Sequence, residues 1–380
     1  MRRAFKCLVG GVFLLGLTSC GHKTPEIQPT VEKVAPLPAP AEKAPQPRPL
    51  PSTRKIGLLL PLSGQHTELG QALLNAAEIA IFESNNPSLE LLPQDTAPGA
   101  KVAAQRALKE GAELLLGPVF AQDVTAIKGL SDVSILCFST DQRVAGHGTY
   151  VLGFLPSQQI ERIIAFAKGR GITKIAALTP EDPYGQVVDK TLARLAAQGE
   201  VELLGITHYA HEDVLEGNPG NQGIIDEVES YKNRGMQALL IPEGGEHLHN
   251  LARILSAEGL PVLLGSGQWD APETLTVPEL KGAFFASADP LERQEFENRF
   301  QKQYGTVPPR IASLGYDAVA VASALSDTTY SSQALTGSQG FTGIEGLFRL
   351  TPEGLNERGL AILEVTPSGF RALEPAPRAF

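Results

Sequence analysis

Apolar runs alternate with amphipathic segments along most of the chain. Residues 55–60 form a continuous apolar run, which is typical of a strand buried on both faces. In 70–83 the apolar residues Leu73, Ala76 and Ala80 recur on one helical face, and polar residues occupy another. The other strands predicted in this way are 89–92, 114–117, 134–138, 174–178, 201–206, 238–241 and 262–264, and the other helices are 157–168, 184–197 and 247–258.

Apolar strands separated by helices predict an α/β fold with parallel sheets. The globular part, 55–380, is long enough for two lobes. A short strand near Tyr150 runs into Pro156 and a new helix, which indicates a crossover. We therefore expect two doubly wound parallel-sheet lobes joined by hinge crossovers, with a ligand cleft at the carboxyl ends of both sheets. Lobe 1 is expected to comprise about 55–150 and 265–325, and lobe 2 about 157–264 and 330–372.

The amino end has the organisation of a bacterial lipoprotein signal. Basic residues precede an apolar run, 7–17, which is shorter than the roughly 20 residues needed to span a bilayer. The run ends in Leu-Thr-Ser followed by Cys20. We expect 1–19 to be removed and Cys20 to be acylated; the alternative is an ordinary secretory signal with an incidental cysteine. Gly21 after the cysteine resembles the Gram-negative sorting signal for the outer membrane.

A proline-rich segment, 20–54, follows the predicted cleavage site. It has no aromatic residue, and its prolines are Pro25, Pro29, Pro36, Pro38, Pro40, Pro45, Pro47, Pro49 and Pro51. A segment of this composition cannot form a core, and it extends at about 3.1 Å per residue, which gives a reach of roughly 100 Å. We expect a linker that holds the following domain away from a membrane, or a passive spacer.

Charge and cysteine usage restrict the class of protein. Removal of Arg2, Arg3 and Lys6 with the signal would take the formal net charge from −10 to −13. An acidic chain offers no electrostatic footprint for nucleic acid, so membrane attachment is expected from lipid and not from a basic patch. Cys137 lies in an apolar run and is predicted to be a buried structural thiol.

Several motifs together resemble type 1 periplasmic binding proteins of the branched-chain amino acid receptor kind. The resemblance covers essentially all of the chain beyond the linker and implies the fold of that family, with two lobes around a cleft. The segments that carry it, in order, are Lys-Ile-Gly-Leu-Leu-Leu-Pro-Leu-Ser-Gly at 55–64, Leu-Gly-Gln at 69–71, Leu-Gly-Pro at 116–118, Phe-Ser-Thr at 138–140, Pro-Tyr-Gly-Gln at 183–186 and Tyr-Asp-Ala-Val at 316–319.

Within that superfamily the sequences of 58–64 and 116–119 are most similar to those of penicillin-binding protein activator lipoproteins. That likeness implies a non-enzymatic, outer-membrane-anchored periplasmic protein whose partner is a peptidoglycan synthase. The proline-rich linker stands where those proteins commonly carry a helical-repeat domain. The alternative is a substrate-binding lipoprotein that delivers leucine, another branched-chain amino acid or another small solute to an ABC importer.

The resemblance also implies where a ligand would bind. Family members hold an amino acid carboxylate with hydroxyls and backbone N–H groups of the first lobe, but here Phe120-Ala121 replaces an expected serine and Asp141 follows Thr140. An α-amino acid ligand is therefore less favoured than the fold alone implies. Asp182 is also a good helix N-cap, and Trp269 could brace the hinge. The candidate cleft residues are Ser63, Gly64, Val119, Phe120, Ser139, Thr140, Asp182, Tyr184, Glu243, Gly244 and Trp269.

No motif for catalysis or for a cofactor emerges. Neither phosphate-binding glycine motif follows a strand, and 265–267 lacks the spacing of a nucleophile elbow. Two histidine pairs could be drawn as metal sites, but one lies in a loop and the other at i,i+2 on a helix start, where side chains diverge. We expect solvated histidines and no metal. The pairs, each with its neighbouring acid, are His208 and His211 with Glu212, and His247 and His249 with Glu246.

Overall fold

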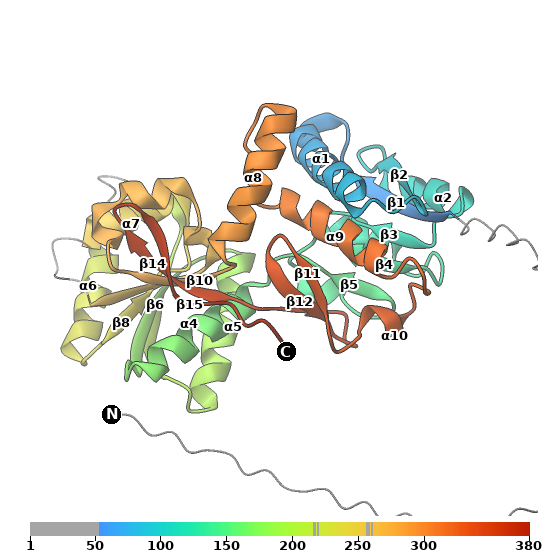
Figure 1. The fold of residues 1–380 in the computed structure, drawn as a ribbon. Coiled ribbons are helices and arrows are strands. Elements are labelled where there is room, and N and C mark those ends of the chain that lie inside the picture. Colours follow the sequence, from blue (N-terminus) through green and yellow to red (C-terminus); the bar gives the residue numbers. More distant parts are fainter. Residues whose placement is uncertain (1–52, 216–217, 219, 256–258, 260) are drawn as a thin grey trace, which may run out of the picture. The chain divides into compact units, whose positions relative to one another are not determined.

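The computed structural model describes residues 53–215, 218, 220–255, 259 and 261–380. They form an α/β protein whose two main sheets consist largely of parallel strands (Figure 1), so the predicted fold class is confirmed. The predicted signal, Cys20 and nearly all of the linker lie outside the described residues. None of the helices in the described part of the chain combines the length and hydrophobicity required to cross a bilayer.

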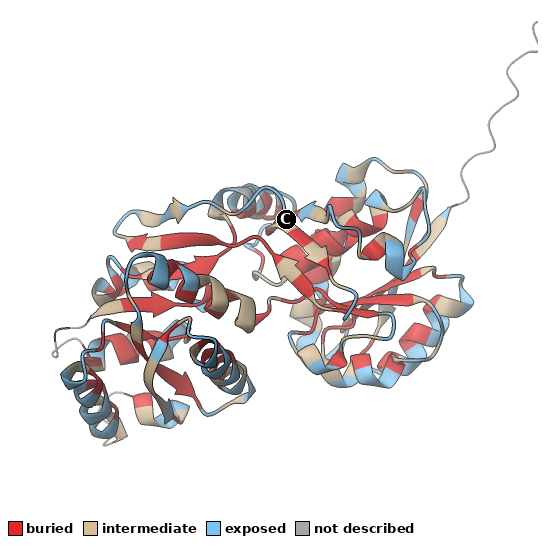
Figure 2. Ribbon diagram, turned by 90° about the horizontal axis from the view of Figure 1, so that it is seen from below, coloured by how far each residue is buried: buried red, intermediate tan, exposed pale blue. Residues whose placement is uncertain are grey.

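The first sheet has five parallel strands in the order β2-β1-β3-β4-β5. Those strands are β1 (Arg54–Leu60), β2 (Leu89–Asp95), β3 (Leu114–Leu116), β4 (Ser134–Cys137) and β5 (Thr149–Val151). Leu58 packs toward helices α1 (Thr67–Ser84) and α9 (Ala312–Ala324), whereas Leu59 packs on the opposite face with α2 (Ala100–Lys109). Both faces of the sheet are buried (Figure 2), which explains the continuous apolar runs.

The second sheet has seven strands in the order β15-β14-β10-β9-β8-β6-β7, and only β14 and β15 run antiparallel to their neighbours. Its strands are β6 (Lys174–Pro180), β7 (Glu202–Tyr209), β8 (Ala238–Leu240), β9 (Val262–Gly265), β10 (Phe284–Ser287), β14 (Ala361–Thr366) and β15 (Gly369–Glu374). Helices α4 (Pro156–Gly169) and α5 (Pro183–Ala197) pack on one face of this sheet. The opposite face is covered by α6 (Gly220–Asn233) and α7 (Gly245–Leu255).

A small antiparallel sheet packs beside the first sheet. Its strands are β11 (Phe341–Gly343), β12 (Gly346–Leu350) and β13 (Asn356–Arg358). The Asn356 amide donates hydrogen bonds to the carbonyl oxygens of Val151, at 2.8 Å, and Gly153, at 2.9 Å. Because Phe348 and Leu350 also join the core of the first sheet, this small sheet belongs to the first lobe.

The other helices complete the described part of the chain. Helix α8 (Pro290–Tyr304) packs Phe296 and Phe300 against α1 and Ala312. The remaining α-helices are α3 (Ala121–Ile127) and α10 (Ser332–Leu335). The 3-10 helices are η1 (Gly64–His66), η2 (Gln142–Val144), η3 (His211–Val214), η5 (Gly267–Trp269), η6 (Pro272–Thr276) and η7 (Pro278–Leu280).

The division of the chain between the lobes differs from the expected one. Strand β10 pairs with β9 and β14 in the second sheet, so the chain does not return to lobe 1 at 265. The segment 341–358 was expected in lobe 2, but it forms the small sheet of lobe 1. The reason is that β10 follows β9 without a regular α-helix between them, so its short apolar run gave no sign of a further strand in the same sheet.

The chain passes between the lobes at 152–155, 288–289 and 359–360, and these crossovers form the hinge.

Close packing also fixes the loop after β1. A Cβ atom on Gly70 would lie 2.1 Å from the carbonyl oxygen of Pro61, so only glycine lets α1 begin this close to the strand end. That contact accounts for the Leu-Gly-Gln motif at 69–71.

Candidate functional site

A groove of about 1020 Å³ is lined by both lobes. Lobe 1 contributes 140–143 and 351–357, and lobe 2 contributes the start of α4 and the exposed side of α5. Charged side chains of both signs line it. Many of these are already paired: Arg143 binds Asp141, and Arg194 binds Glu161. The groove therefore combines a largely apolar lining with charged side chains, two pairs of which are neutralised within it.

Of the residues expected in the cleft, Thr140, Asp182 and Tyr184 line this groove. The Asp182 carboxylate caps α5 by accepting a hydrogen bond of 2.7 Å from the backbone N–H of Gly185. The Tyr184 hydroxyl lies 2.8 Å from the hydroxyl of Ser266. Burial raises the pKa of Tyr184, so this phenol stays neutral. Asp182 thus has the capping role that its position before Pro183 predicted.

The first-lobe candidates Ser63 and Gly64 lie at the loop after β1 and are absent from the groove lining. Ser63 donates a 2.6 Å hydrogen bond to the Asp95 carboxylate, which also accepts from the N–H groups of Leu62 and Ala97 at 2.9 and 3.0 Å. Burial opposes ionisation of Asp95, but these hydrogen bonds outweigh it and lower the pKa of the carboxyl. The Ser63 hydroxyl is therefore bound to a carboxylate within its own lobe.

The other first-lobe candidates also make internal contacts. Val119 is part of the first core, and Phe120 packs on the ring of His66 with 4.8 Å between centroids. The buried Ser139 hydroxyl accepts a hydrogen bond of 3.1 Å from the N–H of Asp141. Hydrogen bonds from Arg143 hold the pKa of Asp141 below its usual value, so this groove-lining side chain is a carboxylate.

Trp269 lies in the core of the second lobe and not in the groove. Its side chain is fully buried, and its indole N–H donates a 2.9 Å hydrogen bond to the carbonyl oxygen of Ile241. The ring occupies the space over Gly265, where a Cβ atom would come within 2.2 Å of it. The structure contradicts a ligand contact by this side chain, because the glycine in β9 leaves room for the indole to turn inward.

Glu243 and Gly244 follow β8 at the carboxyl edge of the second sheet. The Glu243 carboxylate accepts hydrogen bonds from the Tyr209 hydroxyl at 2.8 Å and from His211 at 3.2 Å. The His247 ring stacks on that of His211, with 4.2 Å between centroids. The sequence suggested His208 and His211 as a pair, but His208 instead binds Asp189 at 2.9 Å. The sequence therefore missed a grouping whose members come from different elements.

Buried charged side chains fill the hinge. Arg310 lies 3.0 Å from the Glu345 carboxylate and donates a 2.9 Å hydrogen bond to the carbonyl oxygen of Gly267 in lobe 2. The buried Glu345 also accepts a 3.0 Å hydrogen bond from Ser313. Asp270 pairs with Arg293. We call this group the hinge cluster; its members are Asp270, Arg293, Arg310, Asp317, Glu345 and Arg358.

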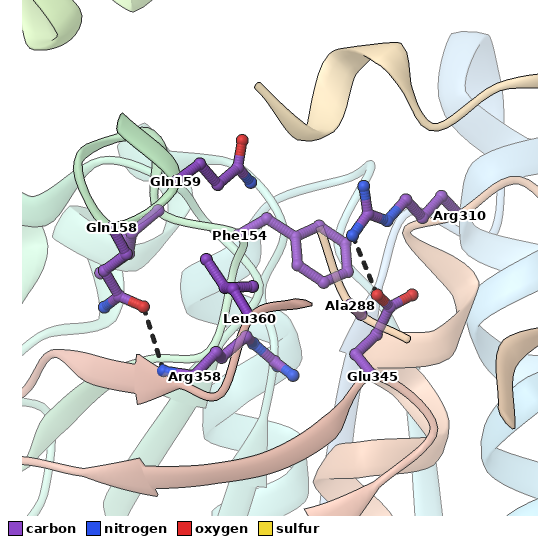
Figure 3. Close-up of a pocket in the computed structure, with 9 residues that line it drawn as sticks. Phe154, Gln158, Gln159, Ala288, Arg310, Glu345, Arg358 and Leu360 are labelled. Atoms are coloured by element: carbon purple, nitrogen blue, oxygen red, sulfur yellow. Dashed lines mark hydrogen bonds and ion pairs between the residues drawn. The ribbon is translucent and has the colours of Figure 1, made fainter. Parts of the chain in front are cut away.

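An aromatic ring connects the two halves of the hinge cluster. Phe154, in the first crossover, lies beneath the guanidinium of Arg310 at 4.6 Å and that of Arg358 at 5.2 Å (Figure 3). Arg358 in turn binds Asp317 at 3.1 Å and the carbonyl oxygen of Leu152 at 3.1 Å. The cavity among these side chains has a volume of about 10 Å³, so the hinge is packed and has no room for a solute.

Burial and charge act in opposite directions on the acids of the hinge cluster. Burial raises the pKa of Asp317 to about 6 although Arg358 opposes the shift, and Glu345 adds to it. Burial also disfavours ionised Asp270, but its hydrogen bond with Arg293 and the charges of Arg310 and Arg293 outweigh burial and lower its pKa. Asp270 is therefore a carboxylate whose charge the fold favours, as expected for the centre of an ion-pair network.

Comparisons with known proteins agree on the fold. A model of the family described as periplasmic binding protein matches residues 53–368. A putative branched-chain amino acid ABC transporter from Rhodospirillum rubrum has a TM-score of 0.74 at 21% identity, covering 84% of this chain and 100% of that one. The leucine binding protein LivK from Thermotoga maritima has a TM-score of 0.59 at 18% identity, with 84% and 97% covered.

A third solved structure is the LpoA (YraM) C-domain from Haemophilus influenzae, a regulator of PBP1A. Its TM-score is 0.67 at 17% identity, and the match covers 84% of this chain and 99% of that one. Comparison with curated proteins finds no significant relative. At these identities the likeness to solved structures establishes the fold alone.

Proposed function

The chain belongs to the periplasmic binding protein family, whose model matches residues 53–368, and we propose on that basis that it is a non-enzymatic envelope lipoprotein that activates a peptidoglycan synthase. The synthase would be a penicillin-binding protein. The sequence resemblance to activator lipoproteins supports this proposal, and so does the compatibility of the fold with the LpoA C-domain from Haemophilus influenzae, a regulator of PBP1A.

The observation that carries the proposal is that polar groups expected to hold a solute are already hydrogen-bonded to other groups of the chain. Ser63 donates to Asp95, Ser139 accepts from Asp141, and the Tyr184 hydroxyl pairs with Ser266. A solute that used these groups would have to replace hydrogen bonds worth about 0.5–1.5 kcal/mol each, and more for the one to a carboxylate. A surface that docks another protein does not require those groups to be free.

The predicted anchor suits the same role. If Cys20 is acylated, each buried CH₂ group of the chains adds about 0.8 kcal/mol of membrane affinity, and the proline-rich linker would place the domain up to roughly 100 Å from the bilayer. Both features belong to residues outside the described part of the chain. We propose a periplasmic domain tethered to the outer membrane that reaches a synthase at the inner membrane.

Reconstitution tests the proposal directly. The full chain in detergent should bind a purified bifunctional peptidoglycan synthase of the same organism and raise its rate of glycan polymerisation or crosslinking on lipid-linked substrate. A monofunctional transpeptidase from the same envelope serves as the control partner. If no synthase of the organism binds the chain or responds to it at micromolar concentrations, the activator proposal is wrong.

The second candidate is a substrate-binding lipoprotein for an ABC importer. It is favoured by the groove between the lobes, which takes Thr140 from one lobe and Tyr184 from the other. A thermal-shift screen with leucine, other amino acids, short peptides and muropeptides tests it, because a ligand at 100 times its Kd stabilises a protein by about 2.7 kcal/mol. A clear shift with a branched-chain amino acid would favour this candidate over the activator.

One conservative variant separates the two functions. Tyr184→Phe removes the hydroxyl of a groove-lining residue and keeps the ring that packs in the second lobe. A solute receptor that uses this hydroxyl should lose thermal stabilisation by its ligand. If the chain is instead a synthase activator, the Tyr184→Phe variant should stimulate the synthase as strongly as the parent chain does.

A further inference from the structure

Two histidines and a glutamate converge at the carboxyl edge of the second sheet. His211 lies in η3, just after β7, whereas Glu243 follows β8 and His247 lies in the first turn of α7. Each offers one ligand atom, and these atoms all lie within 4.8 Å of one another. We call this group the histidine cluster. It is distinct from the groove lining and from the hinge cluster.

The donor set and the spacing suit a small transition-metal ion. Zinc binds imidazole nitrogen and carboxylate oxygen at about 2.0–2.2 Å, so two tetrahedral ligands lie about 3.4 Å apart. The observed 3.2 Å between His211 Nε2 and a Glu243 oxygen is close to that separation. The two rings are stacked at an interplanar angle of 14°, so one must rotate to point its lone pair at the same ion. The His211 side chain is 44% exposed and has room to do so.

A second layer of contacts already orients the carboxylate. The buried Tyr209 hydroxyl donates to one oxygen of Glu243 at 2.8 Å, and the backbone N–H of Gly244 donates to the other at 2.9 Å. Such partners fix the direction of a metal-binding carboxylate and raise the affinity of a site. In the described structure the hydrogen bond from His211 occupies the position that a metal would take.

The surrounding charge favours a cation. Glu212 and Asp213 follow His211 in η3, and Glu246 precedes His247 in α7. With the formal net charge of −10, these acids attract divalent ions to this edge of the lobe. Hard ions such as Mg²⁺ prefer oxygen-only sites, whereas imidazole ligands suit Zn²⁺, Ni²⁺ and Cu²⁺.

We propose that His211, Glu243 and His247 bind one divalent transition-metal ion of the zinc type. Three protein ligands leave at least one coordination position for water or for an oxygen or nitrogen donor of another molecule. The site is independent of the proposed synthase partner, because it requires only residues of the second lobe.

Calorimetric titration of Zn²⁺ into the metal-stripped full chain, in detergent and without a polyhistidine tag, tests the site. One ion per chain should bind. Cys137 is not a competing ligand, because burial raises the pKa of its thiol to about 12. Far-ultraviolet circular dichroism of each variant checks that the fold is retained, and Co²⁺ substitution should give visible absorption that reports nitrogen and oxygen ligands.

Matched variants decide between a metal site and a hydrogen-bonded cluster. Tyr209→Phe, which removes only an outer contact, should weaken binding by about 10- to 100-fold. His247→Ala and Glu243→Gln, which each remove a ligand, should weaken it more. His208→Gln is the control, because His208 lies nearby on β7 but binds Asp189. The proposal is overturned if Zn²⁺ does not saturate the chain at one equivalent, or if the His247 and His208 variants bind it as the parent chain does.

Discussion

Glu345 is the residue whose removal tests the hinge cluster most directly. Its carboxylate is fully buried and accepts hydrogen bonds from Arg310 at 3.0 Å and from Ser313 at 3.0 Å. Arg310 also contacts Gly267 in the second lobe. Glu345→Ala therefore leaves a partly buried cation, Arg310, with fewer partners and weakens the contact between the lobes.

The size of the effect follows from these contacts. A hydrogen bond with a charged partner contributes about 1.5–3 kcal/mol, and breaking a buried ion pair by removing one partner costs about 3–5 kcal/mol. Part of the loss is recovered, because the charge of Glu345 disfavours ionised Asp317. We therefore expect Glu345→Ala to lower the free energy of unfolding by about 3 kcal/mol, at the lower end of that range. Glu345→Gln keeps an acceptor and removes only the charge, so its expected loss is about 1.5–3 kcal/mol.

Urea unfolding at neutral pH measures these losses. Glu295→Ala is the control, because Glu295 is exposed on α8 and its loss should change stability by no more than about 0.5 kcal/mol. A double-mutant cycle with Arg310→Ala should give a coupling of about 0.5–3 kcal/mol. A loss below about 1 kcal/mol for Glu345→Ala, or a coupling near zero, would refute the reasoning.

The same variants report on lobe movement. Spin labels can be attached at Gln105 on α2 and at Gln198 after α5, which are both exposed. Pulsed electron paramagnetic resonance then gives the distribution of distances between the lobes. The parent chain should give a narrow distribution, and Glu345→Ala a broader one. Equal widths would show that the Glu345–Arg310 pair does not hold the lobes.

Further predictions concern the core, acid stability and the anchor. Trp269→Ala should cost about 3–5 kcal/mol of stability in urea, because it empties a buried site, and a loss below about 1 kcal/mol would contradict that placement. The pKa of Asp270 is lowered, so its carboxylate contributes stability above about pH 4 that is lost as the pH falls. Asp270→Asn should therefore lower the free energy of unfolding at pH 7 and make the loss of stability below about pH 5 less steep. An equally steep loss of stability in acid would contradict this linkage. Cys20→Ala should move the protein from the membrane fraction to the soluble periplasm, and persistent membrane attachment would rule out the lipid anchor.

The fold could be predicted because its strands are buried on both faces. Leu58 and Leu59 face opposite cores, so adjacent positions are apolar and the run is conspicuous in the sequence. The strands that escaped prediction are short or antiparallel. β10 follows β9 without a regular α-helix between them, and β14 enters the second sheet from a distant part of the chain. Their placement depends on pairing partners, which a local pattern does not specify.

The histidine cluster could not be predicted from sequence spacing. His211 and His247 are brought together because β7 and β8 flank β6 at one edge of the sheet. Spacing suggested partners close in sequence, such as His249, which lies two residues along α7. Strand order was the missing information, since it alone decides which loops meet.

The hinge cluster bears on which function the fold serves. A solute can move the lobes only by the difference between its affinities for the two arrangements. Moving the lobes apart separates Arg310 from Gly267 and Arg293 from Asp270, which exchanges two charge-assisted contacts for hydration, at about 3–6 kcal/mol in total. A solute would therefore have to bind the moved arrangement about 10²- to 10⁴-fold more tightly than the observed one, since 1.4 kcal/mol is a factor of ten. A partner protein that binds a fixed surface spanning both lobes has no such cost, so a rigid hinge favours the proposed synthase activator over a receptor that opens and closes.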